Sequence, residues 1–191
     1  MDKSSKEFLI KKTEINPKDI MAHGNLGNMH FNEERYEEAI EAYQKVIELD
    51  PDETATLYNL GNVHSEKERY EEAIEAYQKV IEIDPEQVVV YSNLGDAYSE
   101  QEKHDEAIEA YQKVIEIDPK QVAAYNNLGN VYAKQERYNE AIEVYQKTIE
   151  LNPEQIAEYN NLIDKYKRIS QNKIKKNPLI FFRKLFGVFR K

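Results

Sequence analysis

Few residues in this chain have the types and spacing that catalysis or metal binding requires. The chain contains no cysteine, so it has neither a thiolate metal ligand nor a cysteine nucleophile. No HExxH, Gly-x-Ser-x-Gly, phosphate-loop or dinucleotide-binding motif occurs. The many glutamates lie at spacings suited to Glu–Lys pairs on exposed helical faces. We therefore predict that the chain is not an enzyme and that it binds no metal ion or cofactor. Its four histidines are His23, His30, His64 and His104.

Asparagines suggest a different chemistry, because they recur in two regular rows. A carboxamide offers two donors and one acceptor oxygen, so it can pair with both sides of a peptide unit. Such rows predict a groove that binds the backbone of an extended partner segment, and the alternative is that these side chains only face water. The first row is Asn25, Asn59, Asn93, Asn127 and Asn161, and the second row is Asn28, Asn62, Asp96, Asn130 and Asp164.

A period of 34 residues sets the spacing of both rows. The string EEAIEAYQKVIE occupies residues 37–48 and returns unchanged at 71–82, and two close variants follow in the next two periods. Its apolar residues follow the 3–4 spacing of one helical face. A second string with the same apolar spacing precedes each copy. A proline, which is unfavourable in the interior of a helix, ends each period. The prolines are Pro17, Pro51, Pro85, Pro119 and Pro153.

Each period therefore predicts two antiparallel helices joined by a tight turn. One such pair is too small to bury its own apolar face, whereas stacked pairs bury it between neighbours. This predicts an all-α solenoid. Stacking also explains the histidines, because His30 and His64 stand where later periods have a tyrosine. They fill aromatic packing positions and need no metal ion.

The pattern resembles the tetratricopeptide repeat family, which has Leu-Gly, a small Ala, an aromatic residue, an aliphatic residue and Pro at fixed offsets. The resemblance covers residues 20–153 without a gap. It implies a right-handed superhelix of helical hairpins in which the first helix of every repeat lines a concave, protein-binding side. The second repeat, for example, supplies Leu57, Leu60, Gly61, Ala73, Tyr77, Val80 and Pro85.

The resemblance also bears on the kind of partner. The asparagine rows are similar to the ladder in the repeats of O-GlcNAc transferases, which implies extended-peptide binding, without their chemistry because no glycosyltransferase domain is present. Chaperone-binding members grip a C-terminal carboxylate with lysines and an arginine. Gly24 and Val89 stand where those lysines belong, and Asn93 where the arginine belongs. We therefore expect no role as a co-chaperone of Hsp70 or Hsp90.

Both ends depart from the repeat, which suggests four parts. A leading half-repeat helix is expected because only the second half of the pattern precedes Pro17. A capping helix is expected at the other end, where Ile163 replaces the glycine and Pro178 falls where a further helix would have its middle. The parts are 1–19 (half-repeat), 20–153 (four repeats: 20–53, 54–87, 88–121 and 122–155), 154–170 (cap) and 171–191 (tail).

Charge is distributed unevenly along the chain. The formal net charge is −10, yet all residues from Lys165 onward include ten Lys or Arg and no Asp or Glu, so the preceding residues carry −20. The acidic body argues against a nucleic-acid partner. The apolar runs are too short for a secretory segment or a membrane-spanning helix. We expect a cytoplasmic protein, with peripheral attachment to a membrane as an option.

The tail is the individual feature of this sequence. From Pro178 onward its apolar residues cover one half of a helical projection and its basic residues the other half. That pattern is typical of a helix lying in a membrane interface, and anionic lipid would attract the basic side. The alternatives are docking on the chain's own solenoid or on another copy, which would give a homo-oligomer. The residues concerned are Phe181, Phe182, Arg183, Lys184, Leu185, Phe186, Phe189, Arg190 and Lys191.

Together these features predict a non-catalytic scaffold that binds a protein or peptide partner in its groove. The tail would attach this scaffold to a membrane surface or link copies together. A function of another class is also open: a regulatory or targeting subunit of an enzyme complex, with catalysis supplied by a different chain.

Overall fold

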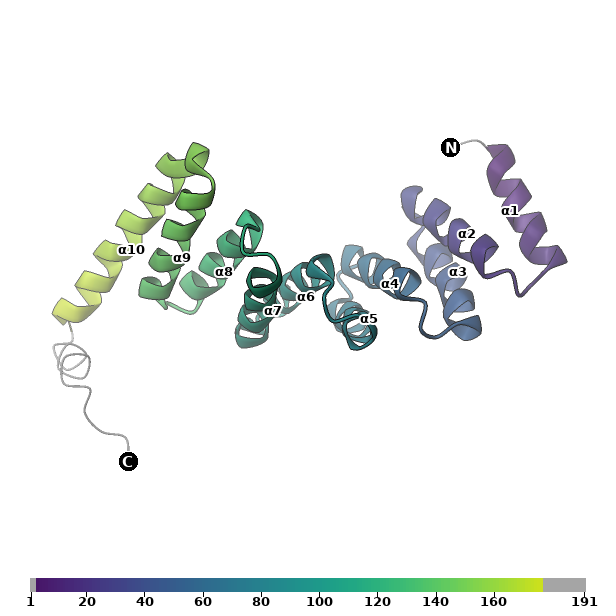
Figure 1. Cartoon of the computed structure of the whole chain (residues 1–191), viewed down its shortest axis with the longest axis horizontal. Helices are drawn as coiled ribbons and strands as arrows, with labels where there is room; N and C mark the ends of the chain where they lie inside the picture. Colours follow the sequence, from purple (N-terminus) through teal and green to yellow (C-terminus); the bar gives the residue numbers. More distant parts are fainter. Residues whose placement is uncertain (1–2, 177–191) are drawn as a thin grey trace, which may run out of the picture. The chain divides into compact units, whose positions relative to one another are not determined.

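The computed structural model describes residues 3–176 as ten α-helices and one short 3₁₀ turn. The described residues fall into two compact units, with the division after Ile117. Figure 1 shows the helices following one another as antiparallel pairs within each unit. Unit 1 contains α1 (Lys3–Ile15), α2 (Ile20–Asn32), α3 (Tyr36–Leu49), α4 (Thr54–Glu66), α5 (Tyr70–Ile83), α6 (Val88–Glu100) and α7 (His104–Ile117). Unit 2 contains α8 (Val122–Lys134), α9 (Tyr138–Leu151), the 3₁₀ turn Pro153–Gln155 and α10 (Ile156–Lys176).

The turn inside each hairpin is made by a glutamate in the left-handed conformation. Glu68 has φ of 56°, its N–H donates to the Ser65 carbonyl, and the following Arg69 N–H donates to the His64 carbonyl at 2.9 Å. This is the Schellman ending of a helix, a place where glycine is the usual residue. The same geometry closes the first helix of every repeat, at Glu34, Glu68, Glu102 and Glu136.

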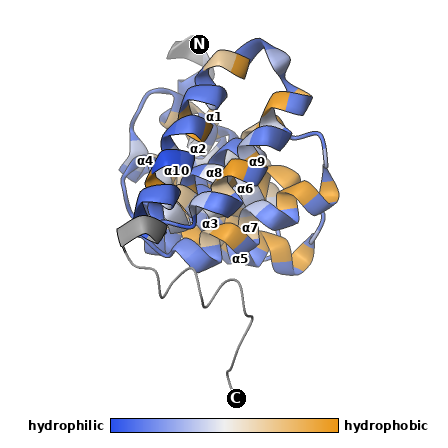
Figure 2. Ribbon diagram, turned by 90° about the vertical axis from the view of Figure 1, so that its left-hand side faces the viewer, coloured by the Kyte–Doolittle hydropathy of each residue, from blue (hydrophilic) through white to orange (hydrophobic). Residues whose placement is uncertain are grey.

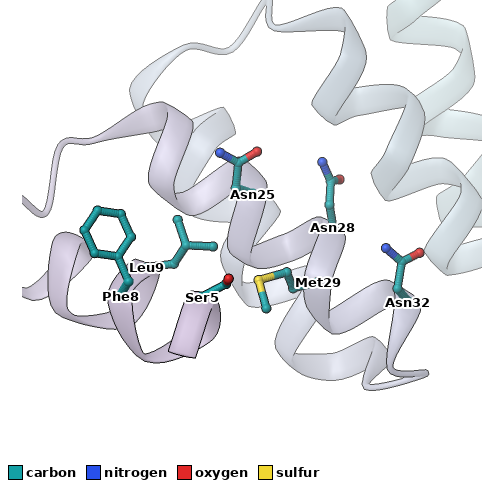
Figure 3. A pocket seen from close by; sticks show the side chains of 7 residues that line it. All are labelled: Ser5, Phe8, Leu9, Asn25, Asn28, Met29 and Asn32. Carbon is teal, nitrogen blue, oxygen red and sulfur yellow. The ribbon is translucent and has the colours of Figure 1, made fainter. Parts of the chain in front are cut away.

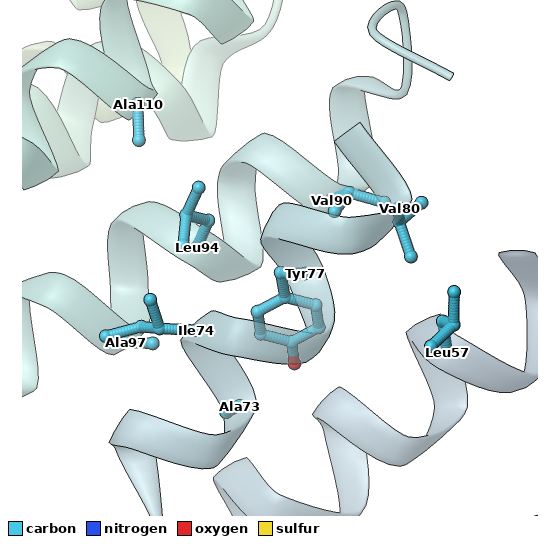
Figure 4. Close-up of a cluster of buried hydrophobic side chains, with 9 residues drawn as sticks. All are labelled: Leu57, Ala73, Ile74, Tyr77, Val80, Val90, Leu94, Ala97 and Ala110. Carbon is cyan, nitrogen blue, oxygen red and sulfur yellow. The ribbon is translucent and has the colours of Figure 1, made fainter. Parts of the chain in front are cut away.

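Neighbouring hairpins bury a shared core in unit 1. Leu57 of α4, Tyr77 of α5 and Val90 of α6 are each at most 2% exposed and belong to one cluster (Figure 4). Hydrophilic and hydrophobic segments alternate along the helix ribbons in Figure 2, as expected for helices with one buried face. The complete cluster is Leu57, Ala73, Ile74, Tyr77, Val80, Val90, Leu94, Ala97 and Ala110.

The Leu-Gly signature is explained by a close approach within each hairpin. A Cβ added to Gly61 would lie 2.5 Å from Cε1 of Tyr77, so the ring occupies the space that a side chain would need. A Cβ added to Gly27, Gly95 or Gly129 would likewise lie 2.4–2.6 Å from Cε1 of the equivalent tyrosine. The glycine therefore lets the aromatic ring of the second helix lie directly on the backbone of the first.

In unit 2, α10 closes the last hairpin. Tyr145 of α9 is fully buried and stacks with Tyr159 and Tyr166 of α10, at centroid distances of 5.6 and 6.2 Å. Lys173 pairs with Glu136 of the turn between α8 and α9. Helix α10 continues to Lys176, beyond the end predicted for the capping helix at 170, and these contacts explain the longer helix.

The predicted all-α hairpin architecture is confirmed within each unit. The right-handed superhelical course and the boundaries of the four parts stay predictions. Residues 177–191, which hold the predicted attachment site of the tail, lie outside the described residues. No helix in the described range of 3–176 is long and apolar enough to cross a membrane.

Candidate binding groove

The two amide rows lie on the first helices of the repeats. In unit 1 they occupy α2, α4 and α6, and we call these six residues the ladder face: Asn25, Asn28, Asn59, Asn62, Asn93 and Asp96. In unit 2, Asn127 and Asn130 lie on α8, and Asn161 and Asp164 on α10. Asn25, Asn28, Asp96, Asn130, Asn161 and Asp164 are exposed, whereas the other predicted groove residues are half-buried.

In each of the four repeats, a buried tyrosine holds the second-row residue. The hydroxyl of Tyr77 donates to Oδ1 of Asn62 at 2.8 Å, across the hairpin that both residues share. Tyr43 donates to Asn28 at 2.6 Å, Tyr111 to Asp96 at 2.6 Å and Tyr145 to Asn130 at 2.7 Å. Burial raises the pKa of Tyr43 to about 12, so this hydroxyl keeps its proton and remains a donor.

Two residues of the first row, Asn59 and Asn93, join one repeat to the next. Nδ2 of Asn59 donates to Oδ1 of Asn28 at 3.1 Å, and Nδ2 of Asn93 donates to Oδ1 of Asn62 at 2.9 Å. Each second-row oxygen in these two joints therefore accepts from a tyrosine of its own repeat and an asparagine of the following repeat. The Nδ2 amides of Asn28 and Asn62 and the Oδ1 atoms of Asn59 and Asn93 take no part in these bonds. The arrangement fixes the orientation of the amides and leaves both donors and acceptors for a ligand.

A pocket of about 700 Å³ lies at the N-terminal end of the ladder face (Figure 3). Helix α1 supplies an apolar wall with Phe8, which is 64% exposed, and Leu9. Helix α2 contributes a mixed wall that contains Met29 and three amides. We call this the N-terminal pocket; it is lined by Ser5, Phe8, Leu9, Asn25, Asn28, Met29 and Asn32. It combines apolar contact area with hydrogen-bonding groups, as sites for peptide side chains do.

A second pocket, of about 300 Å³, lies further along the same face. We call it the central pocket. Its lining includes two aromatic residues, Phe31 and Tyr77, and two carboxylates, Glu66 and Asp96, but no lysine or arginine. The remaining lining residues are Asn62, Ser65 and Asn93. This pocket is therefore acidic and partly aromatic, in contrast to the N-terminal one.

Two of the four histidines, His30 and His64, are buried in packing positions, as their sequence context predicts. His23 Nε2 lies 3.0 Å from the Pro17 carbonyl, and Tyr125 at the equivalent place of the fourth repeat donates to the Pro119 carbonyl at 3.2 Å. His64 is buried, and this burial is the main reason why its pKa is lowered. Among residues 3–176, no group of three His, Asp or Glu side chains is placed to hold a metal ion.

Sequence reasoning missed the residues that support the ladder and shape the central pocket. The tyrosine lies 15 residues after its second-row partner in every repeat, a constant spacing that was available as a signal. Phe31 was missed because it breaks the repeat, with Ser65 and Ser99 at the equivalent positions. Glu66 was missed because its position is variable: the first repeat has Asn32 there and the third has Glu100.

Comparison with known proteins agrees with this geometry. The family model for the tetratricopeptide repeat matches residues 19–86, 53–120 and 91–154, which together cover more than half of the chain. The chain belongs to the tetratricopeptide repeat family. No curated protein sequence matches it.

Solved structures of MamA are similar to this tetratricopeptide repeat chain. A crystal structure of MamA has a TM-score of 0.74 at 28% identity and covers 78% of this chain and 87% of the other. MamA 41-end from Desulfovibrio magneticus RS-1 has a TM-score of 0.74 at 25% identity, with coverages of 80% and 86%. The MamA RS-1 ArsTM double mutant has a TM-score of 0.75 at 26% identity, with coverages of 80% and 85%. The chain is thus a repeat scaffold of the class that presents an extended surface to protein partners.

Proposed function

We propose that this protein is a non-catalytic scaffold whose ladder face binds an extended segment of a partner protein. The observation that carries the proposal is that the oxygen and the nitrogen of a second-row amide have separate roles. Its oxygen is fixed by Tyr43 or Tyr77, so the Nδ2 group of Asn28 or Asn62 is oriented before a ligand arrives. Fixed donors at successive repeats suit the carbonyls of an extended chain, and less ordering entropy is lost on binding.

The sharpest test removes the Nδ2 donors of Asn28 and Asn62 and keeps the hydrogen bonds that the side-chain oxygens at these positions accept. Asp96 shows that an aspartate accepts the tyrosine hydroxyl at this position, so N28D/N62D should retain the hairpin contacts while losing the amide donors. Two lost hydrogen bonds of about 0.5–1.5 kcal/mol each sum to about 1–3 kcal/mol, which corresponds to binding weaker by about 5- to 150-fold. Affinity purification from the source cell, with partners quantified by mass spectrometry, would measure this loss.

A matched control separates groove chemistry from added charge. Q44E/Q146E introduces the same two charges at exposed positions on the second helices α3 and α9. This variant should retain the partners that N28D/N62D loses. Equal retention by both variants would contradict the groove proposal. The variant in which Asn59, Asn93 and Asn127 become alanine supplies a second, independent disruption of the ladder and should also lose partners.

The tail is proposed as an attachment segment for a membrane surface or for other copies of the chain. This proposal is supported by the sequence of residues 177–191, which joins four phenylalanines to four basic residues and no acid. Flotation with anionic vesicles should recover the full chain and lose a chain ending at Asn172 if the tail binds lipid. Light scattering should show oligomers of the full chain and a monomer of the truncated chain if the tail links copies. A monomer that fails to float would refute both versions.

A further inference from the structure

We propose that the C-terminal part of the tail, residues 177–191, binds the ladder face of a second copy of this chain, across the N-terminal and central pockets of its unit 1. This inference rests on the proposed function, because it names an occupant for the same binding face. It also gives the tail a defined partner in place of a general surface. Two neighbouring pockets of different chemistry carry the inference, since the tail combines the same two chemistries.

The N-terminal pocket matches the apolar residues of the tail. Phe8 is 64% exposed at its edge, and Leu9 and Met29 extend the apolar wall. Exposed aromatic surface in a soluble protein favours coverage by another apolar group. The tail supplies four of the six phenylalanines of the chain: Phe181, Phe182, Phe186 and Phe189.

The central pocket matches the basic residues of the tail. Its lining includes Glu66 and Asp96 and no lysine or arginine, whereas residues 177–191 contain two arginines, two lysines and no acid. The aromatic ring of Phe31 adds a wall against which the stem of a long basic side chain can pack. Charge and shape therefore favour a cationic side chain in this pocket.

The carboxylate at position 96 is not needed for the hairpin itself. Asn28, Asn62 and Asn130 occupy the equivalent position and accept the same tyrosine hydroxyl at 2.6–2.8 Å, as Asp96 does at 2.6 Å. A neutral amide therefore performs the structural role equally well. The carboxylate of Asp96 therefore adds negative charge to the central pocket beyond what the tyrosine contact requires.

The two pockets are close enough for one segment to reach both. On α2, Phe31 of the central pocket directly precedes Asn32 of the N-terminal pocket and lies about one turn after Asn28 of that pocket. Fifteen residues span about 22 Å even as a helix, about twice the 10–12 Å width of one helix. A bound tail would cover the amides of Asn28 and Asn62, so it would compete with any other partner for the ladder face.

The absence of tryptophan allows a clean test in the full chain. Phe182→Trp places a single reporter in the tail, and its emission should be blue-shifted and protected from acrylamide if the tail is bound. Adding E66Q/D96N should raise acrylamide quenching about threefold at low salt, and 1 M NaCl should reduce this difference because salt screens charge pairs. The hairpin survives this change, since an asparagine already serves at positions 28, 62 and 130.

The control carries the same charge change outside the pockets. E75Q/E109Q removes two exposed glutamates from α5 and α7, and its quenching should equal that of the reporter alone. The inference would be overturned if E66Q/D96N and E75Q/E109Q changed acrylamide quenching equally. It would also be overturned if the reporter were solvent-exposed in the chain that carries Phe182→Trp alone. If the emission of the reporter shifts only when anionic vesicles are added, and E66Q/D96N does not alter this shift, the inference is also overturned and the tail is assigned to membranes.

Two further measurements complete the design. Because the contact joins two copies, dilution should expose the reporter, and protection that does not depend on protein concentration would overturn the inference. Partner capture by a chain ending at Asn172 separates this inference from the proposed function. If that truncated chain captures partners through Asn28 and Asn62 while the reporter stays exposed, the groove function stands and tail binding fails.

Discussion

At the scale of single residues, the Gly–Tyr contact is the most sensitive point of each repeat. The Tyr77 ring lies where a Cβ on Gly61 would be, and Tyr77 is 1% exposed, so the ring has little room to move. Cores at this density respond to one added methyl group with shifted side chains and lost stability. The contact also positions the hydroxyl that fixes Asn62, which links packing to the binding face.

We predict that Gly61→Ala lowers the free energy of unfolding by about 1–3 kcal/mol, because the added Cβ forces Tyr77 out of its place. Gly24→Ala is the matched control, since its Cβ would meet only Val46 Cγ2, at 3.9 Å. That change should be neutral or stabilising by up to about 1 kcal/mol through helix propensity. Urea unfolding followed by circular dichroism measures both, and equal midpoints would contradict the prediction.

We predict a second residue-scale effect, the pH dependence that His64 confers. Burial lowers the pKa of His64, and Nδ1 has no hydrogen-bond partner among the described residues. Stability is therefore full above the unfolded pKa of about 6.5 and falls as the pH drops below it, because the unfolded chain accepts the proton more readily.

His64→Tyr should reduce the loss of melting temperature between pH 7.5 and pH 5.5, because Tyr does not titrate there and two later repeats hold Tyr98 and Tyr132 at this position. His23→Tyr is the control: His23 is only half-buried and its nitrogen faces the Pro17 carbonyl. A melting-temperature loss in His64→Tyr as large as in the wild type would refute the role of His64.

At the scale of elements, the turns show how a repeat tolerates an unfavourable residue. Left-handed geometry costs an ordinary residue roughly 1–2 kcal/mol, yet a glutamate adopts it in all four repeats. We predict that Glu68→Gly raises the free energy of unfolding by about 1 kcal/mol, since glycine adopts this φ without strain. Glu75→Gly in the middle of α5 should instead lower it by about 1 kcal/mol. Thermal unfolding distinguishes these opposite signs.

The helices themselves were predictable, whereas the joints between their side chains were not. The period of 34 residues and the apolar spacing predicted each hairpin, because both patterns follow from backbone geometry. The bond from Tyr77 to Asn62 depends on where a ring comes to rest against Gly61, which sequence spacing alone cannot specify. The central pocket was missed for a related reason: it requires Phe31 and Glu66 from neighbouring repeats to face one another.

At the scale of the whole molecule, stability is distributed among neighbours and not centred on one core. In arrays of this kind each repeat contacts only the adjacent ones, so a defect weakens its own surroundings. The two compact units, divided after Ile117, suggest that unit 1 and unit 2 open separately.

We predict that Gly61→Ala reduces hydrogen-exchange protection mainly in α4 and α5 and leaves α9 and α10 protected. Gly129→Ala, which brings a Cβ to 2.6 Å from Cε1 of Tyr145, should show the reverse distribution. Amide exchange followed by mass spectrometry resolves these segments. Uniform loss of protection along the chain would show that it unfolds as a single cooperative body.

The joint between repeats has a consequence for how such a chain can change in length. One half of the joint, the hydroxyl that reaches back 15 residues, is internal to a repeat, and the other half, Asn59 to Asn28 or Asn93 to Asn62, crosses to the following repeat. A duplicated block of 34 residues therefore carries a complete set of both connections. Gene duplication could insert one more block without any new side chain, and each insertion would add one further pair of amides to the surface available for recognition.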